Sequence, residues 1–272
     1  MNNAGMSRRG FGLSAVGAVA AAAATGIGAG AANAQSSSAS LTPSLAQQYG
    51  VPLSGPVVFD SRLSFEQAYG TSSDPQRAKD LALMKPHMAL VNVLYRGFDN
   101  ALHFGQIVVN KAIENETKIL FVKMFQLGFP IKSVIPQSQF GYDDETSMQA
   151  NNTSNFRPDR LGSGNLSEHF KGASFDINTF VNPFDVLNDD GSRTIQPAGA
   201  SYDPRAKGAI VKDSDLRRMW SARDYEWGGN WGDPQADPPI DFYQIGYFDY
   251  QHMQFNQKKM DTVKLSLPEG LA

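Results

Sequence analysis

The absence of cysteine is the feature that most limits how this 272-residue chain can fold. Without thiols the chain cannot form disulfide bonds, thiolate metal sites or a cysteine nucleophile. Its content of 41% hydrophobic and 19% charged residues is typical of a globular protein. We therefore expect a fold that depends on core packing and on any bound metal.

The first 34 residues resemble an export signal. Paired arginines at Arg8 and Arg9 precede an Ala/Gly-rich, weakly apolar run that ends in Ala32-Asn33-Ala34. This pattern predicts a twin-arginine signal peptide over residues 1–34, cleaved after Ala34. A membrane anchor is the alternative, but alanine and glycine contribute little to membrane insertion. We expect a periplasmic or secreted protein with no membrane span in its mature form.

The rest of the chain shows short, mixed elements without a repeating strand–helix–strand rhythm. A stretch rich in Ser, Ala and Gln over 35–50 predicts a linker, and 51–272 a single domain. The predicted elements are a helix over 64–84, strands at 89–95 and 106–109 forming a hairpin, a helix from Asn110 to Gly128, a long polar loop over 185–215, a helix at 216–224 and a strand at 252–255. These elements indicate an α+β fold with a small antiparallel sheet and flanking helices. The net charge of −3, without a basic block, argues against a nucleic-acid partner.

One of the four histidines, His169, stands seven residues before Asp176, with a glycine turn at Gly172 between them. The segment after Gly172 alternates as a strand does, so Phe175 and Ile177 share one face and Asp176 points to the other. A carboxylate between large apolar residues is expected to be partly buried, and it then needs a cation, a metal or several donors to stay charged.

A second stretch places Asp249 three residues before His252, which opens another alternating strand. Together His169, Asp176 and His252 could supply three ligands to zinc and leave the fourth position open for water, as in catalytic zinc sites. A further carboxylate nearby could accept a proton from that water. The spacing alone does not distinguish such a site from core histidines.

Several stretches resemble the D-alanyl-D-alanine carboxypeptidase family of zinc peptidases, which includes L-alanyl-D-glutamate endopeptidases. The pattern S-E-H-x-x-G-x-x-x-D-I-N over 167–178 is similar to the zinc-binding signature of that family. Further segments occur in the order found in its endopeptidase branch: Phe129-Pro130-Ile131, Asp143-Asp144, Asn151-Asn152-Thr153-Ser154, Tyr202-Asp203-Pro204-Arg205 and Trp227-Gly228-Gly229-Asn230-Trp231. The similarity extends over residues 88–256, and several ordered motifs together are a strong signal.

The resemblance implies a role for each candidate residue. It makes His169, Asp176 and His252 the ligands of one zinc ion (Zn²⁺), and Asp249 the general base. It also implies an arginine that holds the substrate and stabilises the oxyanion. Arg157 is favoured for that role because Pro158 follows it, and Arg160 is the rival.

The resemblance also implies a Hedgehog/DD-peptidase-like zinc peptidase fold and a substrate, the stem peptides of peptidoglycan. The order of the motifs favours cleavage between L-Ala and D-Glu. The alternatives are a D-Ala-D-Ala carboxypeptidase and a catalytically inactive cell-wall-binding module on the same scaffold.

The chain departs from the family pattern at two places. Ser174 stands where the family usually has alanine, and an additional stretch over 232–248 is expected to form a lid or rim loop. Glu168 is expected to point away from the zinc, because neighbours on an extended segment face opposite sides. His87 and His103 are expected to be structural. Four aromatic residues could pack in the core or form a wall for the peptide: Trp227, Trp231, Tyr247 and Tyr250.

Overall fold

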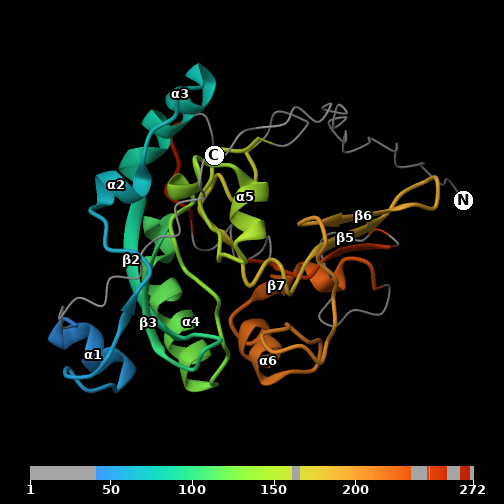
Figure 1. Ribbon diagram of the computed structural model, residues 1–272. Helices are drawn as coiled ribbons and strands as arrows, with labels where there is room; N and C mark the ends of the chain where they lie inside the picture. Colours follow the sequence, from blue (N-terminus) through green and yellow to red (C-terminus); the bar gives the residue numbers. More distant parts are fainter. Residues whose placement is uncertain (1–40, 161–165, 234–243, 245, 256–263, 270–272) are drawn as a thin grey trace, which may run out of the picture.

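The computed structural model describes residues 41–160, 166–233, 244, 246–255 and 264–269. Within these ranges the chain forms a mixed α+β fold with three small sheets (Figure 1). The predicted signal peptide, residues 1–34, lies outside the described part. No helix in the described ranges has both the length and the apolar character needed to cross a bilayer.

The first sheet contains the predicted hairpin. Strands β2 (Met88–Arg96) and β3 (Leu102–Asn110) pair in antiparallel register from Met88 opposite Asn110 to Arg96 opposite Leu102. Strand β1 (Val58–Phe59) adds to β3 in parallel. The long helix α4 (Glu114–Gln126) packs against β2. It follows a 3₁₀ turn, η2 (Lys111–Ile113), whose start Asn110 caps by accepting a hydrogen bond from the backbone N–H of Ala112.

The second sheet brings together distant parts of the sequence, in the order β4-β9-β7. Strands β4 (Ser174–Asp176), β9 (His252–Phe255) and β7 (Tyr225–Trp227) are all antiparallel to their neighbours. Phe175 and Ile177 belong to the main hydrophobic core, as predicted from the alternation. Because neighbouring residues of a strand face opposite sides, the other face of this sheet carries polar side chains.

The third sheet corrects the prediction of a long loop over 185–215. Strands β5 (Phe184–Leu187) and β6 (Arg193–Gln196) form a hairpin, and β8 (Tyr247–Asp249) pairs with the other edge of β5. The polar run between β5 and β6 is a turn in which Gly191 has a φ of 81°. The strands are only four residues long and mostly partly buried, and the run between them is polar, so the sequence shows no clear apolar alternation here.

The linker predicted over 35–50 is wrong for its described part, 41–50. Residues Pro43–Tyr49 form helix α1, which begins at the cap Thr42 and ends at Gly50 with a φ of 65°. Leu45 and Tyr49 are buried in the main core, and the Tyr49 ring meets Phe125 of α4 edge-on at 5.4 Å. The sequence contains the residues that cap this helix, but the Ser/Ala/Gln-rich composition of the stretch favoured a linker over a helix.

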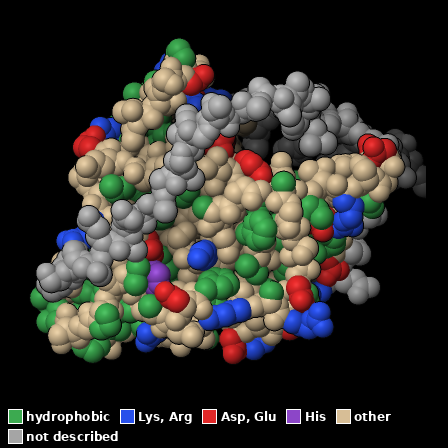
Figure 2. Space-filling model, viewed as in Figure 1, with side chains coloured by type: hydrophobic (Ala, Val, Ile, Leu, Met, Phe, Trp, Pro, Cys, Tyr) green, Lys and Arg blue, Asp and Glu red, His purple; other side chains and the backbone are tan. Residues whose placement is uncertain are grey.

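The helix predicted over 64–84 is divided into α2 (Phe65–Tyr69) and α3 (Pro75–Met84). Gly70, with a φ of 65°, ends the first, and Asp74 with Pro75 starts the second. The other short elements are α5 (Asp144–Gln149), α6 (Asp215–Ser221), η1 (Lys85–His87), η3 (Gln137–Phe140) and η4 (Gly228–Asn230). On the described part of the face in Figure 2, basic and acidic side chains are interspersed.

Candidate metal centre

The polar face of the β4-β9-β7 sheet carries the predicted ligands. Asp176 on β4 stands directly opposite His252 on β9 in the antiparallel register. His169 comes from the turn that precedes β4, where Gly172 has a φ of 68°. A Cβ at Gly172 would lie 2.5 Å from the Met88 side chain and 2.7 Å from the backbone nitrogen of Asn110, so this turn requires glycine.

The three side chains converge on one point. One ligand atom from each of His169, Asp176 and His252 lies within 4.8 Å of the others, and all three residues are buried. His169 Nε2 is 3.1 Å from His252 Nδ1 and 3.1 Å from Asp176 Oδ2, and His252 Nδ1 is 3.0 Å from Asp176 Oδ1. Within the described ranges, this is the one group of three such residues close enough to hold a metal ion.

The outer hydrogen bonds of the two histidines define which nitrogen of each ring faces inward. His169 Nδ1 lies 2.8 Å from the backbone oxygen of Asn155, which can only accept, so Nδ1 carries the hydrogen. His252 Nε2 lies 2.8 Å from Gln254 Oε1 and donates to it in the same way. Such partners are typical of histidines that bind metals, because they fix the tautomer and the ring orientation. His169 Nε2 and His252 Nδ1 are therefore the nitrogens available to a metal.

The electrostatics of the group are those of a site built for a cation. Burial lowers the pKa of His169 to about 4, so its Nε2 bears a lone pair at neutral pH. Burial alone would raise the pKa of Asp176, but the charges of His169 and Arg157 and the hydrogen bonds hold it well below the ordinary value. Burial also opposes the charged form of His252, yet Asp176 raises its pKa to about 9. Asp176 therefore stays ionised, and its negative charge stabilises a positive charge beside it.

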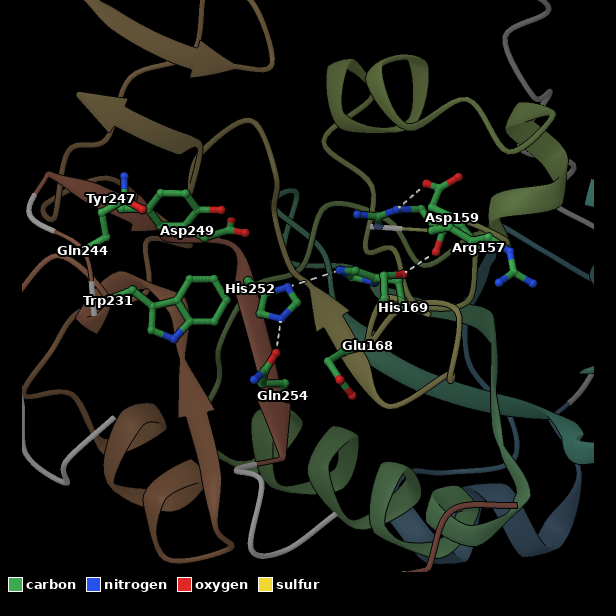
Figure 3. A pocket seen from close by; sticks show the side chains of 12 residues that line it. Arg157, Asp159, Glu168, His169, Trp231, Gln244, Tyr247, Asp249, His252 and Gln254 are labelled. Carbon is green, nitrogen blue, oxygen red and sulfur yellow. Dashed lines mark hydrogen bonds and ion pairs between the residues drawn. The ribbon is translucent and has the colours of Figure 1, made fainter. Parts of the chain in front are cut away.

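Asp249 lies beside the trio, at the end of β8, and lines the same pocket (Figure 3). Burial raises its pKa to about 7, against the lowering effect of His252. Its Oδ1 is inaccessible to solvent and has no hydrogen-bond partner. A carboxyl group with such a pKa can accept and return a proton near neutral pH.

The pocket has a volume of about 460 Å³, with an aromatic side and a charged side. Trp231 and Tyr247 form the aromatic side, and the Trp231 ring lies 5.1 Å from the His252 ring. The indole N–H of Trp231 donates to Glu226 Oε1 at 2.8 Å. Of the four aromatic residues singled out from the sequence, Trp227 instead packs in the core, and Tyr250 stacks on Tyr202 with ring centroids 3.7 Å apart.

The two candidate arginines have different partners. Arg157 Nη1 donates to Asp176 Oδ2 at 3.0 Å and so contacts a predicted ligand directly. Arg160 also lines the pocket, but its Nε and Nη2 donate to Asp80 of α3 at 3.0 and 2.7 Å. The contact with the trio therefore belongs to Arg157.

The expectation of an extended segment around Glu168 is wrong, and the Glu168 carboxylate pairs with Lys171 at 2.7 Å. Residues 168–172 form turns, not an extended segment, so Glu168 and His169 line the same pocket. Most of the stretch 232–248, expected to be a lid, lies outside the described residues. Two of its residues that are described, Gln244 and Tyr247, line the pocket.

The sequence assigned no role to several residues that contact the trio or its arginine, among them Gln254, Asp144 and Asp159. Gln254 lies two positions after His252 on the same face of β9, and that spacing could have revealed it. Asp144 contacts Arg157, and only its place in a motif of the resembled family singled it out. The remaining two histidines lie outside this group: His87 contacts Ser266, and His103 lies between two aspartates.

Comparisons of the chain with models of protein families, with curated proteins and with solved structures return no match. The geometry of this site is consequently the main basis for a functional proposal.

Proposed function

We propose that the chain is a zinc-dependent peptidase that hydrolyses peptidoglycan stem peptides, between L-Ala and D-Glu. The observation that carries the proposal is the convergence of two histidine nitrogens and one carboxylate beside a second carboxyl group whose pKa is about 7. Two nitrogens and one oxygen are the ligand set of catalytic zinc sites that leave a position open. The substrate class rests on the sequence resemblance alone.

The charges around Asp176 support a divalent cation. Three carboxylates, those of Asp144, Asp159 and Asp176, each lie within 3.1 Å of the single guanidinium of Arg157. Arg157 balances one of these three negative charges, and the protonated imidazole of His252 offsets a second. A divalent ion that displaces the His252 proton would balance both of the charges that Arg157 leaves. Buried charges are stable only when they are compensated in this way.

Each residue then has a defined task. When bound, zinc supplies a Lewis acid and lowers the pKa of its water from about 16 to about 7. Asp249 accepts a proton on its carboxylate and later gives it to the leaving amine. Asn155 and Gln254 keep the two histidine rings in orientation. Trp231 and Tyr247 provide an apolar wall against which an extended peptide can lie.

Mass spectrometry of muropeptides tests this function. Zinc-loaded protein is incubated with purified peptidoglycan fragments, and an Asp249→Asn variant serves as the control. The proposal expects new fragments that depend on Asp249 and whose masses correspond to cleavage between L-Ala and D-Glu. Loss of a terminal D-Ala would instead identify a carboxypeptidase. Intact stem peptides in the presence of bound zinc would contradict a peptidase and favour a binding module.

We also propose that the protein is exported by the twin-arginine route. The basis is the paired arginines followed by the Ala32-Asn33-Ala34 site. N-terminal sequencing of the exported protein should give a mature chain that starts at Gln35. A mature chain that still starts near Met1 would contradict the proposal.

A further inference from the structure

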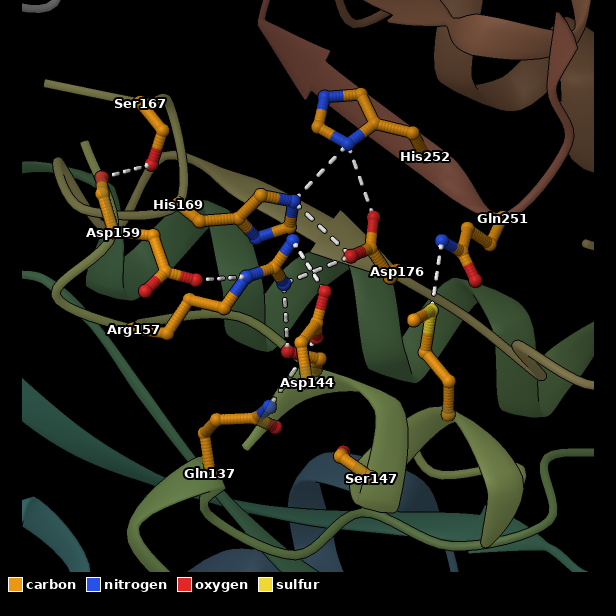
Figure 4. A network of polar contacts seen from close by, with 12 residues as sticks. Gln137, Asp144, Ser147, Arg157, Asp159, Ser167, His169, Asp176, Gln251 and His252 are labelled. Carbon is orange, nitrogen blue, oxygen red and sulfur yellow. Dashed lines mark hydrogen bonds and ion pairs between the residues drawn. The ribbon is translucent and has the colours of Figure 1, made fainter. Parts of the chain in front are cut away.

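Arg157 is the centre of a polar network that ends at a predicted metal ligand (Figure 4). Each of its three guanidinium nitrogens faces a different carboxylate. Nε lies 3.1 Å from Asp159 Oδ2, Nη1 lies 3.0 Å from Asp176 Oδ2, and Nη2 lies 3.1 Å from Asp144 Oδ2. Nη1 also donates to the hydroxyl of Ser154 at 3.1 Å. The planar guanidinium is thus held along all of its edges.

This arrangement limits what Arg157 can do. A guanidinium has five N–H donors in a fixed plane, and turning it toward a substrate would break several charge-assisted hydrogen bonds at once. Its side chain is only 12% exposed, so water could not readily replace the lost partners. The structure therefore favours a group that stays in place and orients Asp176.

Asp176 has little other support on that side. Its Oδ2 receives the N–H of Arg157 and lies 3.1 Å from His169 Nε2, which bears a lone pair. Without the N–H of Arg157, Oδ2 would lose its N–H donor, and the carboxylate would be held mainly through Oδ1, which lies 3.0 Å from His252 Nδ1. The direction of Arg157 in turn depends on its other two carboxylates.

Asp144 is the partner that comes from a separate element. It lies in the first turn of α5, its Oδ2 contacts Arg157, and its Oδ1 lies 3.3 Å from the donating Nε2 of Gln137. Asp159, in contrast, is only two residues from Arg157 in the chain. Asp144 therefore connects the position of Arg157 to the packing of α5 and η3.

We propose that Asp144 is a positioning residue, which acts through Arg157 to hold Asp176 in the orientation that binds the metal. Arg157 is, in this account, a support for a ligand before it is a donor to the substrate. The inference rests on the proposed metal site, but not on the identity of the peptide that is cleaved.

The test is the affinity for zinc alone, measured by competition with a chromophoric chelator. Asp144→Asn keeps the size of the side chain and removes its charge. We expect it to weaken zinc binding by about 10- to 100-fold, the usual effect of losing an outer partner of a ligand. Arg157→Lys keeps the charge but loses the planar fork, and we expect a similar loss.

Asp80→Asn is the matched control. It breaks a carboxylate–arginine pair, with Arg160, at the rim of the same pocket, but that pair has no contact with the trio. We expect its zinc affinity to equal that of the wild type. Circular dichroism of the zinc-free proteins establishes that each variant is folded, and Arg157→Lys replaces Asp144→Asn as the test if the latter is not.

The outcomes separate this inference from the proposed function. Wild-type zinc affinity in both Asp144→Asn and Arg157→Lys would overturn the positioning role, and a loss of turnover alone would place Arg157 on the substrate. Equal weakening in Asp80→Asn would also overturn it, by indicating a general loosening of the pocket. If zinc binding weakens as expected but no stem peptide is cleaved, the positioning role stands and the proposed peptidase fails. A wild-type protein that binds no zinc would overturn both.

Discussion

Two clusters of histidine and aspartate stand in different parts of this molecule, and they are built from the same kinds of residue. In one, His103 of β3 lies between Asp60 and Asp99. In the other, His169 and His252 share Asp176. The comparison shows what distinguishes a structural cluster from a metal centre when the composition does not.

The His103 cluster is closed. Nδ1 lies 2.8 Å from Asp60 Oδ2, and Nε2 lies 3.1 Å from Asp99 Oδ1, on the opposite side of the ring. Asp60 also accepts the hydroxyl of Tyr95, whose ring stacks on the imidazole at 5.3 Å. Each nitrogen thus faces its own acceptor, and the acceptors diverge. Such a ring is satisfied as a cation and offers no lone pair to a metal.

In the trio of His169, Asp176 and His252, one nitrogen of each ring points toward a shared point instead of toward an acceptor of its own. The outer nitrogens donate to Asn155 and Gln254, and the inner nitrogens face one another and the carboxylate. The direction of the ring nitrogens, which converge in one cluster and diverge in the other, is what separates the two clusters. Sequence spacing would mislead here, because His103 and Asp99 are four residues apart and His169 and Asp176 are seven.

The largest expected effect is on kcat, and it should follow from replacing the aspartate beside the trio but not from replacing one beside His103. Asp249→Asn should lower kcat on stem peptides by about 10²- to 10⁴-fold, the usual contribution of a general base, and should keep zinc. Asp99→Asn beside His103 should leave kcat close to that of the wild type. The measurement is the rate of fragment release by zinc-loaded proteins. Comparable rates in Asp249→Asn and the wild type would remove Asp249 from the mechanism.

Replacing His103 should instead lower the stability of the folded protein. His103→Gln leaves the largely buried Asp60 without its imidazole donor, and we expect the free energy of unfolding to fall by about 1–3 kcal/mol. The affinity for zinc should not change, because the cluster has no contact with the trio. Denaturant unfolding and zinc competition, measured on the same preparations, provide both values. An unchanged stability together with weakened zinc binding would reverse the assignment of the two clusters.

A smaller effect concerns pH. Burial opposes the charged form of His103, but its hydrogen bonds to Asp60 and Asp99 outweigh this and raise its pKa in the folded protein. Its contribution to stability is therefore complete below the ordinary histidine pKa of about 6.5 and is lost as pH rises through the folded value. The difference in stability between the wild type and His103→Gln should be larger at about pH 5.5 than at about pH 9. A difference that grows with pH would contradict the closed, charged cluster.

Apolar patterns in the sequence correctly predicted the strands and the buried positions that such patterns specify directly. The alternation after Gly172 correctly predicted that Phe175 and Ile177 enter the core and that Asp176 faces away from it. The hairpin of β2 and β3 followed from two apolar runs around a turn. In contrast, α1 and the hairpin of β5 and β6 were missed, because these elements are short and lie in stretches whose overall composition resembles that of a loop.

In the site, too, some residues could be identified from the sequence and others could not. The three candidate ligands were identified from the sequence, and the structure brings them together. The partners that orient them depend on contacts that no local pattern encodes. Asp144 of helix α5 contacts Arg157, the backbone oxygen of Asn155 accepts a hydrogen bond from His169, and Glu168 lines the pocket because its segment turns. Such contacts follow from packing between elements, and a single sequence does not reveal packing.

The most direct test of the central claim is the zinc content of three purified proteins after loading and dialysis, measured by elemental analysis. The account predicts one zinc ion per chain in the wild type and in His103→Gln, and none in His252→Ala, which lacks a nitrogen of the convergent trio. A full equivalent of zinc in His252→Ala, or none in the wild type, would contradict the claim that this trio is a metal centre.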